Sequence, residues 1–188
     1  PDPSGDGEAI WAAGRQGRRA VLPLSGIKLP GIHNVENYMA AIAAVDGLVP
    51  DEVLRTFAKS FGGVEHRIEL VRELDGVRYY NDSIASSPNR TIAGLNSFPQ
   101  RVILIAGGKD KGISYDSLGP VLNDHVKLLI LCGATAGVIR ASVEQAPNYR
   151  GLKIVDVEDY PQAVSLARDR AEAGDVVLLS PASTSFDR

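Results

Sequence analysis

The chain has 188 residues, of which 44% are hydrophobic and 23% charged, and its formal net charge is -3. This length can bury a core and fits one large domain or two small ones. The slightly acidic balance predicts no basic face of the kind that binds nucleic acid. No apolar run approaches the roughly 20 residues needed to cross a bilayer, and no signal peptide opens the chain. We therefore expect a cytoplasmic protein with neither nucleic acid nor membrane as a partner.

The single cysteine, Cys132, lies in the apolar run LLILCG and is interpreted as a small buried hydrophobic residue rather than a catalytic thiol. The chain has no initiator Met and ends at SPASTSFDR. We expect it to be a piece of a longer protein.

The first part of the chain predicts a hairpin followed by two helices. Residues 8–13 and 18–24 favour strands on either side of a Gly-rich turn. A helix is expected from about Val35, with Asn34 as its N-cap, and a second helix after Pro50. The first helix has an expected apolar face of Tyr38, Ala41, Ile42, Val45 and Leu48, and the second has Val53, Leu54, Phe57 and Phe61.

Beyond Gly62-Gly63 the pattern changes to alternating strands and helices. Strands are expected at residues 68–74, 77–81, 102–106, 128–132, 154–157 and 176–180, and helices at about 89–98, 115–124, 135–146 and 159–173. The runs VILIA, LLILC and VVLL are nearly continuous, which is typical of parallel strands covered on both faces. We therefore expect an α/β fold: residues 1–64 as the end of one unit, and residues 65–188 as a small doubly wound, mostly parallel domain.

Ligands bind at the carboxyl ends of the strands in an open parallel sheet, so the segments after each strand are candidate sites. These segments are NDSIASSPN, GGKDKG, GATAG and SPASTSFD. The glycines and lysines of AGGKDKG suit a close approach to an anion, but a strand-to-helix turn with solvated lysines explains them about as well. The spacing matches neither a P-loop nor a dinucleotide fingerprint.

Three other positions are candidates for ligand contact, and two of them also have a structural interpretation. Arg67 offers a planar fork for phosphate oxygens, or is a surface arginine near a linker. Asp82 is suited to accept hydrogen bonds from ribose hydroxyls, or to cap its local turn. Asn37 shares a helix face with Asn34 and is suited to contact a base edge. The remaining His and carboxylate residues show no metal-ligand spacing.

Together these motifs resemble the Mur ligase family, ATP-dependent enzymes that form amide bonds in peptidoglycan synthesis. The residues that carry the resemblance are G-I-H-N-V-E-N-Y-M-A-A at 31–41, H-R at 66–67, N-D-S at 81–83 and GDVVLLSPASTSFD at 174–187. The last of these is similar to the members that add D-glutamate.

The resemblance implies that residues 1–64 are the C-terminal part of a central ATPase domain and that residues 65–188 are a Rossmann-like C-terminal ligase domain. It implies transfer of D-glutamate to UDP-N-acetylmuramoyl-L-alanine through an acyl phosphate made with ATP and Mg²⁺, by a monomer. The P-loop and the metal ligands would precede Pro1, so the chain is not expected to turn over alone.

By motif match, the nucleotide would be contacted by Asn34 and Asn37 at the adenine, by Arg67 at the phosphates and by Asp82. The glutamate would be contacted by Ser86, Lys111, Ser185 and Phe186. Either Lys109 or Lys111 fits the family's lysine, and we favour Lys111. Ile84 stands where many relatives have lysine.

Two alternatives stay open. One is a different amide ligase, either another Mur-type member or one of the folylpolyglutamate synthase kind, against which the segment SPASTSFD argues. The other is a non-catalytic Rossmann-like binding module, which would have no P-loop upstream of Pro1.

Overall fold

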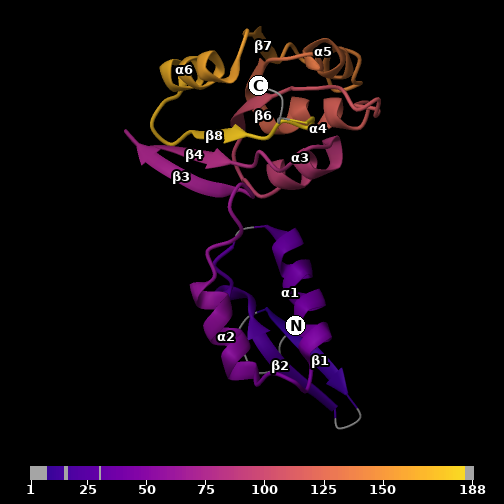
Figure 1. The fold of residues 1–188 in the computed structure, drawn as a ribbon, viewed down its shortest axis with the longest axis vertical. Helices are drawn as coiled ribbons and strands as arrows, with labels where there is room; N and C mark the ends of the chain where they lie inside the picture. Colours follow the sequence, from indigo (N-terminus) through magenta and orange to yellow (C-terminus); the bar gives the residue numbers. More distant parts are fainter. Residues whose placement is uncertain (1–7, 15–16, 30, 185–188) are drawn as a thin grey trace. The chain divides into compact units, whose positions relative to one another are not determined.

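Two separate sets of internal contacts divide the chain into a first unit, Pro1–Gly63, and a second unit, Val64–Arg188 (Figure 1). The computed structural model describes residues 8–14, 17–29 and 31–184. Within these ranges, no helix is both long enough and apolar enough to span a membrane.

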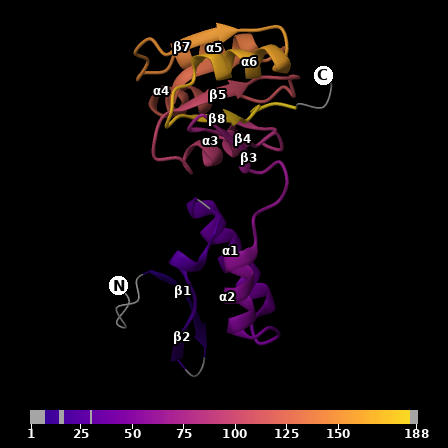
Figure 2. The same ribbon diagram turned by 90° about the vertical axis from the view of Figure 1, so that its left-hand side faces the viewer.

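The first unit is a hairpin packed against two helices. Strands β1 (Ala9–Gly14) and β2 (Gly17–Pro23) pair antiparallel and are followed by a short 3₁₀ helix, η1 (Leu24–Gly26). Helix α1 (Ile32–Val45) packs on β1, and α2 (Asp51–Ser60) packs on β2 and η1 (Figure 2). Its buried core consists of Ile10, Val21, Leu22, Tyr38, Ile42 and Ala58.

The start of α1 differs from the sequence prediction. The helix begins at Ile32 with Gly31 at its N-cap, where φ is 96°. Glycine adopts this backbone conformation without the penalty that a Cβ would bring, so the helix can begin early. The Asn34 amide donates to the Gly31 carbonyl at 3.0 Å, which places Asn34 inside the helix. The prediction that Asn34 caps the helix was therefore wrong.

The expected apolar faces of both helices were only partly right. Ala41 and Leu48 are exposed, and so are Val53 and Phe57. In α2 the small, fully buried Ala58 lets the helix approach the hairpin closely, with Leu54 and Phe61 packed beside the core. The buried side of α2 is therefore rotated away from the expected one.

The second unit is built on a six-stranded sheet with the strand order β3-β4-β8-β5-β6-β7. Only β3 runs antiparallel to its neighbour, and the other pairs are parallel, which confirms the expected mostly parallel α/β fold. The strands are β3 (Glu69–Leu74), β4 (Val77–Asn81), β5 (Val102–Ala106), β6 (Val126–Leu131), β7 (Lys153–Asp156) and β8 (Val176–Leu179).

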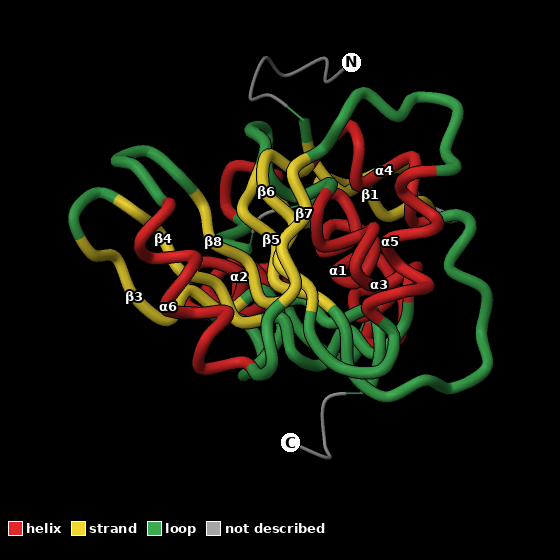
Figure 3. The backbone as a smooth tube through the Cα atoms, turned by 90° about the horizontal axis from the view of Figure 1, so that it is seen from above, coloured by secondary structure: helices red, strands yellow, loops and turns green. Residues whose placement is uncertain are grey.

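Helices cover both faces of this sheet. They are α3 (Pro88–Leu95), α4 (Leu118–His125), α5 (Ala136–Glu144) and α6 (Tyr160–Arg170). Figure 3 shows α6 on the opposite side of the sheet from α3, α4 and α5. Side chains of β5 alternate accordingly: Leu104 lies in the core under α3, α4 and α5, whereas Ile103 and Ile105 lie in the core under α6. The sheet is thus buried on both faces.

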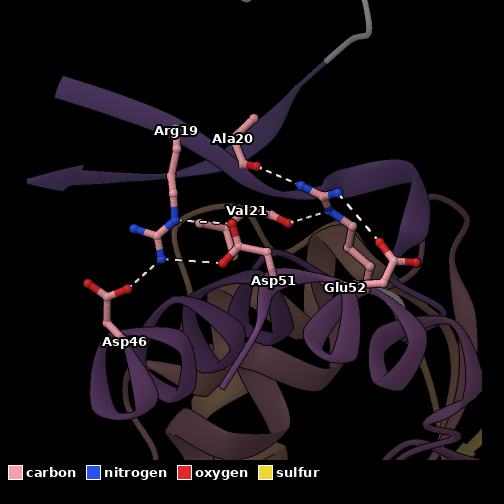
Figure 4. A network of polar contacts seen from close by, with 7 residues as sticks. Arg19, Ala20, Val21, Asp46, Asp51 and Glu52 are labelled. Atoms are coloured by element: carbon pink, nitrogen blue, oxygen red, sulfur yellow. Dashed lines mark hydrogen bonds and ion pairs between the residues drawn. The ribbon is translucent and has the colours of Figure 1, made fainter. Parts of the chain in front are cut away.

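Two arginines tie the hairpin of the first unit to its helices. The Arg19 guanidinium contacts the carboxylates of Asp46 at 2.5 Å and Asp51 at 3.0 Å (Figure 4). Arg55 donates to the carbonyl groups of Ala20 at 2.9 Å and Val21 at 2.8 Å. Water screens the exposed ion pairs of Arg19, so they add little to stability. The packing of the small core therefore carries most of the stability of this unit.

Candidate functional site

The segments that follow β4, β5 and β8 meet at the carboxyl edge of the sheet. The Asp82 amide donates to the Leu179 carbonyl at 2.8 Å, and the Gly107 amide donates to the Pro181 carbonyl at 2.9 Å. Lys109 and Thr184 form an isolated antiparallel bridge. The exit of β8 therefore lies between the exits of β4 and β5, and three of the segments singled out in the sequence form one edge.

The glycine pair of the loop after β5 is required by the protein's own backbone. A Cβ on Gly107 would lie 2.0 Å from the Cys132 carbonyl oxygen, and one on Gly108 would lie 2.4 Å from the Thr184 carbonyl oxygen. Any side chain would force these strand exits apart. We call residues 107–112 the glycine–lysine loop; its glycines allow the exits of β5, β6 and β8 to lie close together.

Lys111 and Ser86, two of the predicted glutamate residues, are brought together. The Lys111 ammonium donates to the Ser86 carbonyl at 3.4 Å, although the residues are 25 positions apart. Lys111 is exposed and Ser86 is half-buried. Ile84, two positions before Ser86, is 47% exposed. Lys111 thus places a positive charge beside a half-buried serine and an exposed apolar side chain at this edge.

Asp82 is enclosed, with only 3% of its surface exposed. One carboxylate oxygen accepts from the Ser180 hydroxyl at 2.8 Å, and the other accepts from the Ile68 amide at 3.3 Å. Thr91 lies 2.9 Å from Ser180, and because the Ser180 proton is committed to Asp82, the Thr91 hydroxyl is the donor. The carboxylate links β4, β8, α3 and the start of β3.

Burial raises the pKa of Asp82 from 3.8 to about 6. The hydrogen bonds from Ser180 and Ile68 oppose this shift because they favour the charged form, and Arg67 and Arg90 oppose it more weakly. Desolvation nevertheless prevails, so this carboxyl group titrates closer to neutral pH than an exposed one.

Arg67 is exposed on a turn of unusual backbone shape. The residues on either side have positive φ, 65° for His66 and 46° for Ile68, which is uncommon for residues other than glycine. The Asp82 carboxylate accepts from the Ile68 amide, and the Ile84 amide donates to the His66 carbonyl at 3.3 Å. These bonds hold the turn in a shape that displays the Arg67 side chain to solvent.

The predicted residues of the first unit also adjoin one another. Asn37 donates through its side-chain amide to the Asn34 side chain at 3.4 Å, so the two share a face of α1. Asn34 is buried and Asn37 is exposed. Ser185 and Phe186 lie outside the described residues. Among residues 8–14, 17–29 and 31–184, no group of three or more His, Cys, Asp or Glu side chains could hold a metal ion.

A cluster of buried hydroxyls at this edge was missed in the sequence. Ser183 lies 2.9 Å from both Tyr115 and Thr135, and the Tyr160 hydroxyl donates to the Gly107 carbonyl at 2.7 Å. Burial raises the pKa of the Tyr160 phenol, with a smaller contribution from Cys132. The only signal in the sequence was that Thr135 and Ser183 follow strands, in GATAG and SPASTSFD.

Two curated proteins are similar in sequence to most of this chain. It is 55% identical over 165 residues to the UDP-N-acetylmuramoylalanine–D-glutamate ligase of Ruminiclostridium cellulolyticum, covering 86% of this chain and 36% of that protein. It is 56% identical over 171 residues to the ligase of the same name from Acetivibrio thermocellus, covering 89% of this chain and 37% of that protein. The chain thus spans a little over a third of the length of these curated relatives.

Solved structures share the fold at low sequence identity. The UDP-N-acetylmuramate-alanine ligase MurC of Thermotoga maritima matches with a TM-score of 0.65 at 19% identity, over 83% of this chain and 36% of that one. A Mycobacterium tuberculosis folylpolyglutamate synthase complexed with ADP matches with a TM-score of 0.67 at 14% identity, over 95% of this chain and 43% of that one.

The match to a family model covers more than half of the chain. Residues 66–183 match the Mur ligase, glutamate ligase domain. This range contains the carboxyl edge from the Arg67 turn to Ser183, and Thr184 lies just outside it. The chain therefore belongs to the Mur ligase family.

Proposed function

We propose that this chain is the acceptor- and nucleotide-contacting part of an ATP-dependent ligase that joins D-glutamate to UDP-N-acetylmuramoyl-L-alanine in the cytoplasm. The observation that carries the proposal is the pairing of Lys111 with Ser86 at the carboxyl edge of the sheet. The names of the relatives with 55% and 56% identity support the choice of D-glutamate. The shared fold alone does not distinguish this ligase from folylpolyglutamate synthase.

The acceptor in this proposal carries two carboxylates and one amine. Lys111 supplies a positive charge for one carboxylate, and the Ser86 segment lies beside it. We assign Ser185 and Phe186, which follow the Lys109–Thr184 bridge, to the same amino acid. A bound carboxylate would replace the Ser86 carbonyl as the partner of Lys111, and this charge-assisted contact is the stronger of the two.

The reaction has two balanced steps. The carboxylate of UDP-N-acetylmuramoyl-L-alanine attacks the γ-phosphorus of ATP, and ADP leaves. The D-glutamate amine then attacks the acyl carbon, phosphate leaves, and the amine loses a proton. We propose that Arg67 binds phosphate oxygens, that Asp82 contacts the nucleotide, and that Asn34 and Asn37 contact the adenine. Mg²⁺ would neutralise phosphate charge; we propose that its ligands belong to the rest of the protein, which we expect to be monomeric.

We propose further that residues 1–64 are the C-terminal part of the central ATPase domain and that residues 65–188 are the ligase domain. The full-length protein should release ADP from ATP only when both UDP-N-acetylmuramoyl-L-alanine and D-glutamate are present. L-Glutamate, D-aspartate and L-lysine serve as competing acceptors. A preference for any of these, or for a folate acceptor, would overturn the assignment. ADP release that needs no acceptor would overturn it as well.

A further inference from the structure

Three buried hydroxyls support the glycine–lysine loop from inside. The hydroxyl cluster consists of Tyr115, Thr135 and Ser183, of which Tyr115 is 4% exposed and the other two are fully buried. Ser183 lies 2.9 Å from Tyr115 and 2.9 Å from Thr135. The three residues come from three different segments at the carboxyl edge, so each contact joins parts of the chain that are far apart in sequence.

The cluster ends on the backbone of Gly108. The Gly108 amide donates to the Thr135 hydroxyl at 3.0 Å, and that hydroxyl lies 3.3 Å from the Gly108 carbonyl. Each hydroxyl has one proton to donate. In one assignment of donors and acceptors, every hydroxyl proton makes a hydrogen bond within the protein. Tyr115 donates to Ser183, Ser183 donates to Thr135, and Thr135 donates to the Gly108 carbonyl. Tyr115 is the first donor of this chain of hydrogen bonds.

Lys111 lies between two residues that belong to this arrangement. Gly108 precedes it by three positions and is bound by Thr135, while Tyr115 follows it by four positions and is bound by Ser183. The Lys109 amide also donates to the carbonyl of Thr184, the neighbour of Ser183, at 3.0 Å. Both ends of the segment that carries Lys111 are therefore fixed to the same buried cluster.

We propose that Tyr115, acting through Ser183 and Thr135, is a positioning residue that sets the location of Lys111 for the carboxylate of the incoming amino acid. This inference rests on the proposed function, in which Lys111 binds D-glutamate. The three hydroxyls are buried and contact one another and the backbone, so their effect reaches the substrate only through the placement of the loop. Affinity for the amino acid should change, whereas affinity for the other two substrates should not.

The test uses steady-state kinetics of the full-length protein. Tyr115→Phe keeps the buried ring and removes one hydroxyl, and we expect it to raise KM for D-glutamate about five- to tenfold, the equivalent of one lost hydrogen bond. KM for ATP and for UDP-N-acetylmuramoyl-L-alanine should stay at the wild-type values. Ser183→Ala should reproduce this pattern, and adding Tyr115→Phe to it should cost little more because the two share one hydrogen bond.

Two matched controls remove hydroxyls outside the cluster. Tyr149→Phe alters an exposed tyrosine of the same unit, and Ser142→Ala removes a hydroxyl that donates within α5 to Ile139. Both should leave all three KM values unchanged. Thr135→Ser keeps a hydroxyl in the cluster and should also keep the wild-type KM for D-glutamate.

An equal rise in all three KM values, or a lower melting temperature with unchanged KM for D-glutamate, would overturn the positioning role. The wild-type protein tests the proposed function separately, through a saturable response to D-glutamate. If Tyr115→Phe fails to fold, Ser183→Ala decides the question by the same criterion.

Discussion

Asp82 and Ser180, 98 positions apart in the chain, share a buried hydrogen bond in which the serine hydroxyl donates to the carboxylate at 2.8 Å. Asn81 and Leu179, the residues just before them, are paired in the parallel ladder of β4 and β8. The bond therefore extends this pairing past the ends of the two strands. It holds together the part of the edge from which the Ser86 turn and the segment 181–184 leave the sheet.

Removing this bond should lower stability. Ser180→Ala should reduce the free energy of unfolding by about 1–3 kcal/mol, because the buried carboxylate loses a donor and finds no water in its place. Urea unfolding of the chain at neutral pH measures the change. Ser142→Ala is the matched control, since that half-buried hydroxyl donates to a carbonyl of its own helix. A loss as large in the control would contradict the special role of the Asp82 bond.

The raised pKa of Asp82 predicts a specific pH dependence. Because the pKa is raised from 3.8 to about 6, the folded state holds the proton more tightly than the unfolded state between these values. The contribution of Asp82 to stability is therefore present below about pH 4 and is lost as the pH rises through about 6. Asp82→Asn lacks this titration. The unfolding free energy of the wild type minus that of the variant should fall by about 3 kcal/mol across this range. A difference that is flat or rises with pH would show that the carboxylate is not destabilised by burial.

Arg67→Ala should affect turnover far more than stability. In the full-length protein, kcat should fall by on the order of 10²–10³, the effect of losing one charged donor to the transferring phosphoryl group. The side chain is exposed, so the free energy of unfolding should change little. Arg150→Ala, also an exposed arginine of the second unit, is the control. A wild-type rate in Arg67→Ala would remove this residue from the mechanism.

Lys111 and Lys109 are two positions apart in one loop and carry the same charge, so each is a control for the other. Lys111→Ala should raise KM for D-glutamate by about 10- to 100-fold, the equivalent of a lost charge-assisted hydrogen bond. Lys109→Ala should have a much smaller effect, because the bridge of Lys109 to Thr184 is made by its backbone. The opposite order of effects would assign the glutamate contact to Lys109.

The contact between α4 and α5 depends on Gly119. A Cβ at this position would lie 1.9 Å from the Ser142 carbonyl oxygen, so Gly119→Ala must push the helices apart and should cost about 1–3 kcal/mol of unfolding free energy. Gly137 lies in α5 with nothing within 4 Å of a Cβ. Gly137→Ala should stabilise the chain by up to about 1 kcal/mol through helix propensity. Thermal unfolding of both variants checks the contrast, and equal effects would contradict it.

Much of the second unit was predictable because its strands are buried on both faces. The run Val102–Ala106 is apolar at every position, and the structure places β5 at these residues. The strand predicted at residues 68–74 is β3, although four of its six residues are exposed. The positions of these strands could be predicted because they depend on the residues within each strand.

What could not be predicted depends on which elements pack together. Val53 and Phe57 are apolar residues at helical spacing, but the pattern does not say which side of α2 meets the hairpin, and both are exposed. The contact between Tyr115 and Ser183 joins residues 68 positions apart, and no local pattern marks it. Of the candidate site, the sequence predicted the segments that meet at the edge, but not the hydroxyls that hold them there.

The central place of β8 in the sheet has a consequence for synthesis of the protein. Among the strands in residues 8–14, 17–29 and 31–184, β8 is the last to be made, yet it lies between β4 and β5 and pairs with both. Ribosomes add roughly 5–20 residues per second and domains generally fold as units. For several seconds, therefore, β4 and β5 have no partner on their facing edges. The carboxyl edge forms only after Val176–Leu179 have emerged from the ribosome, so the candidate site is completed after every other described strand of this unit has been made.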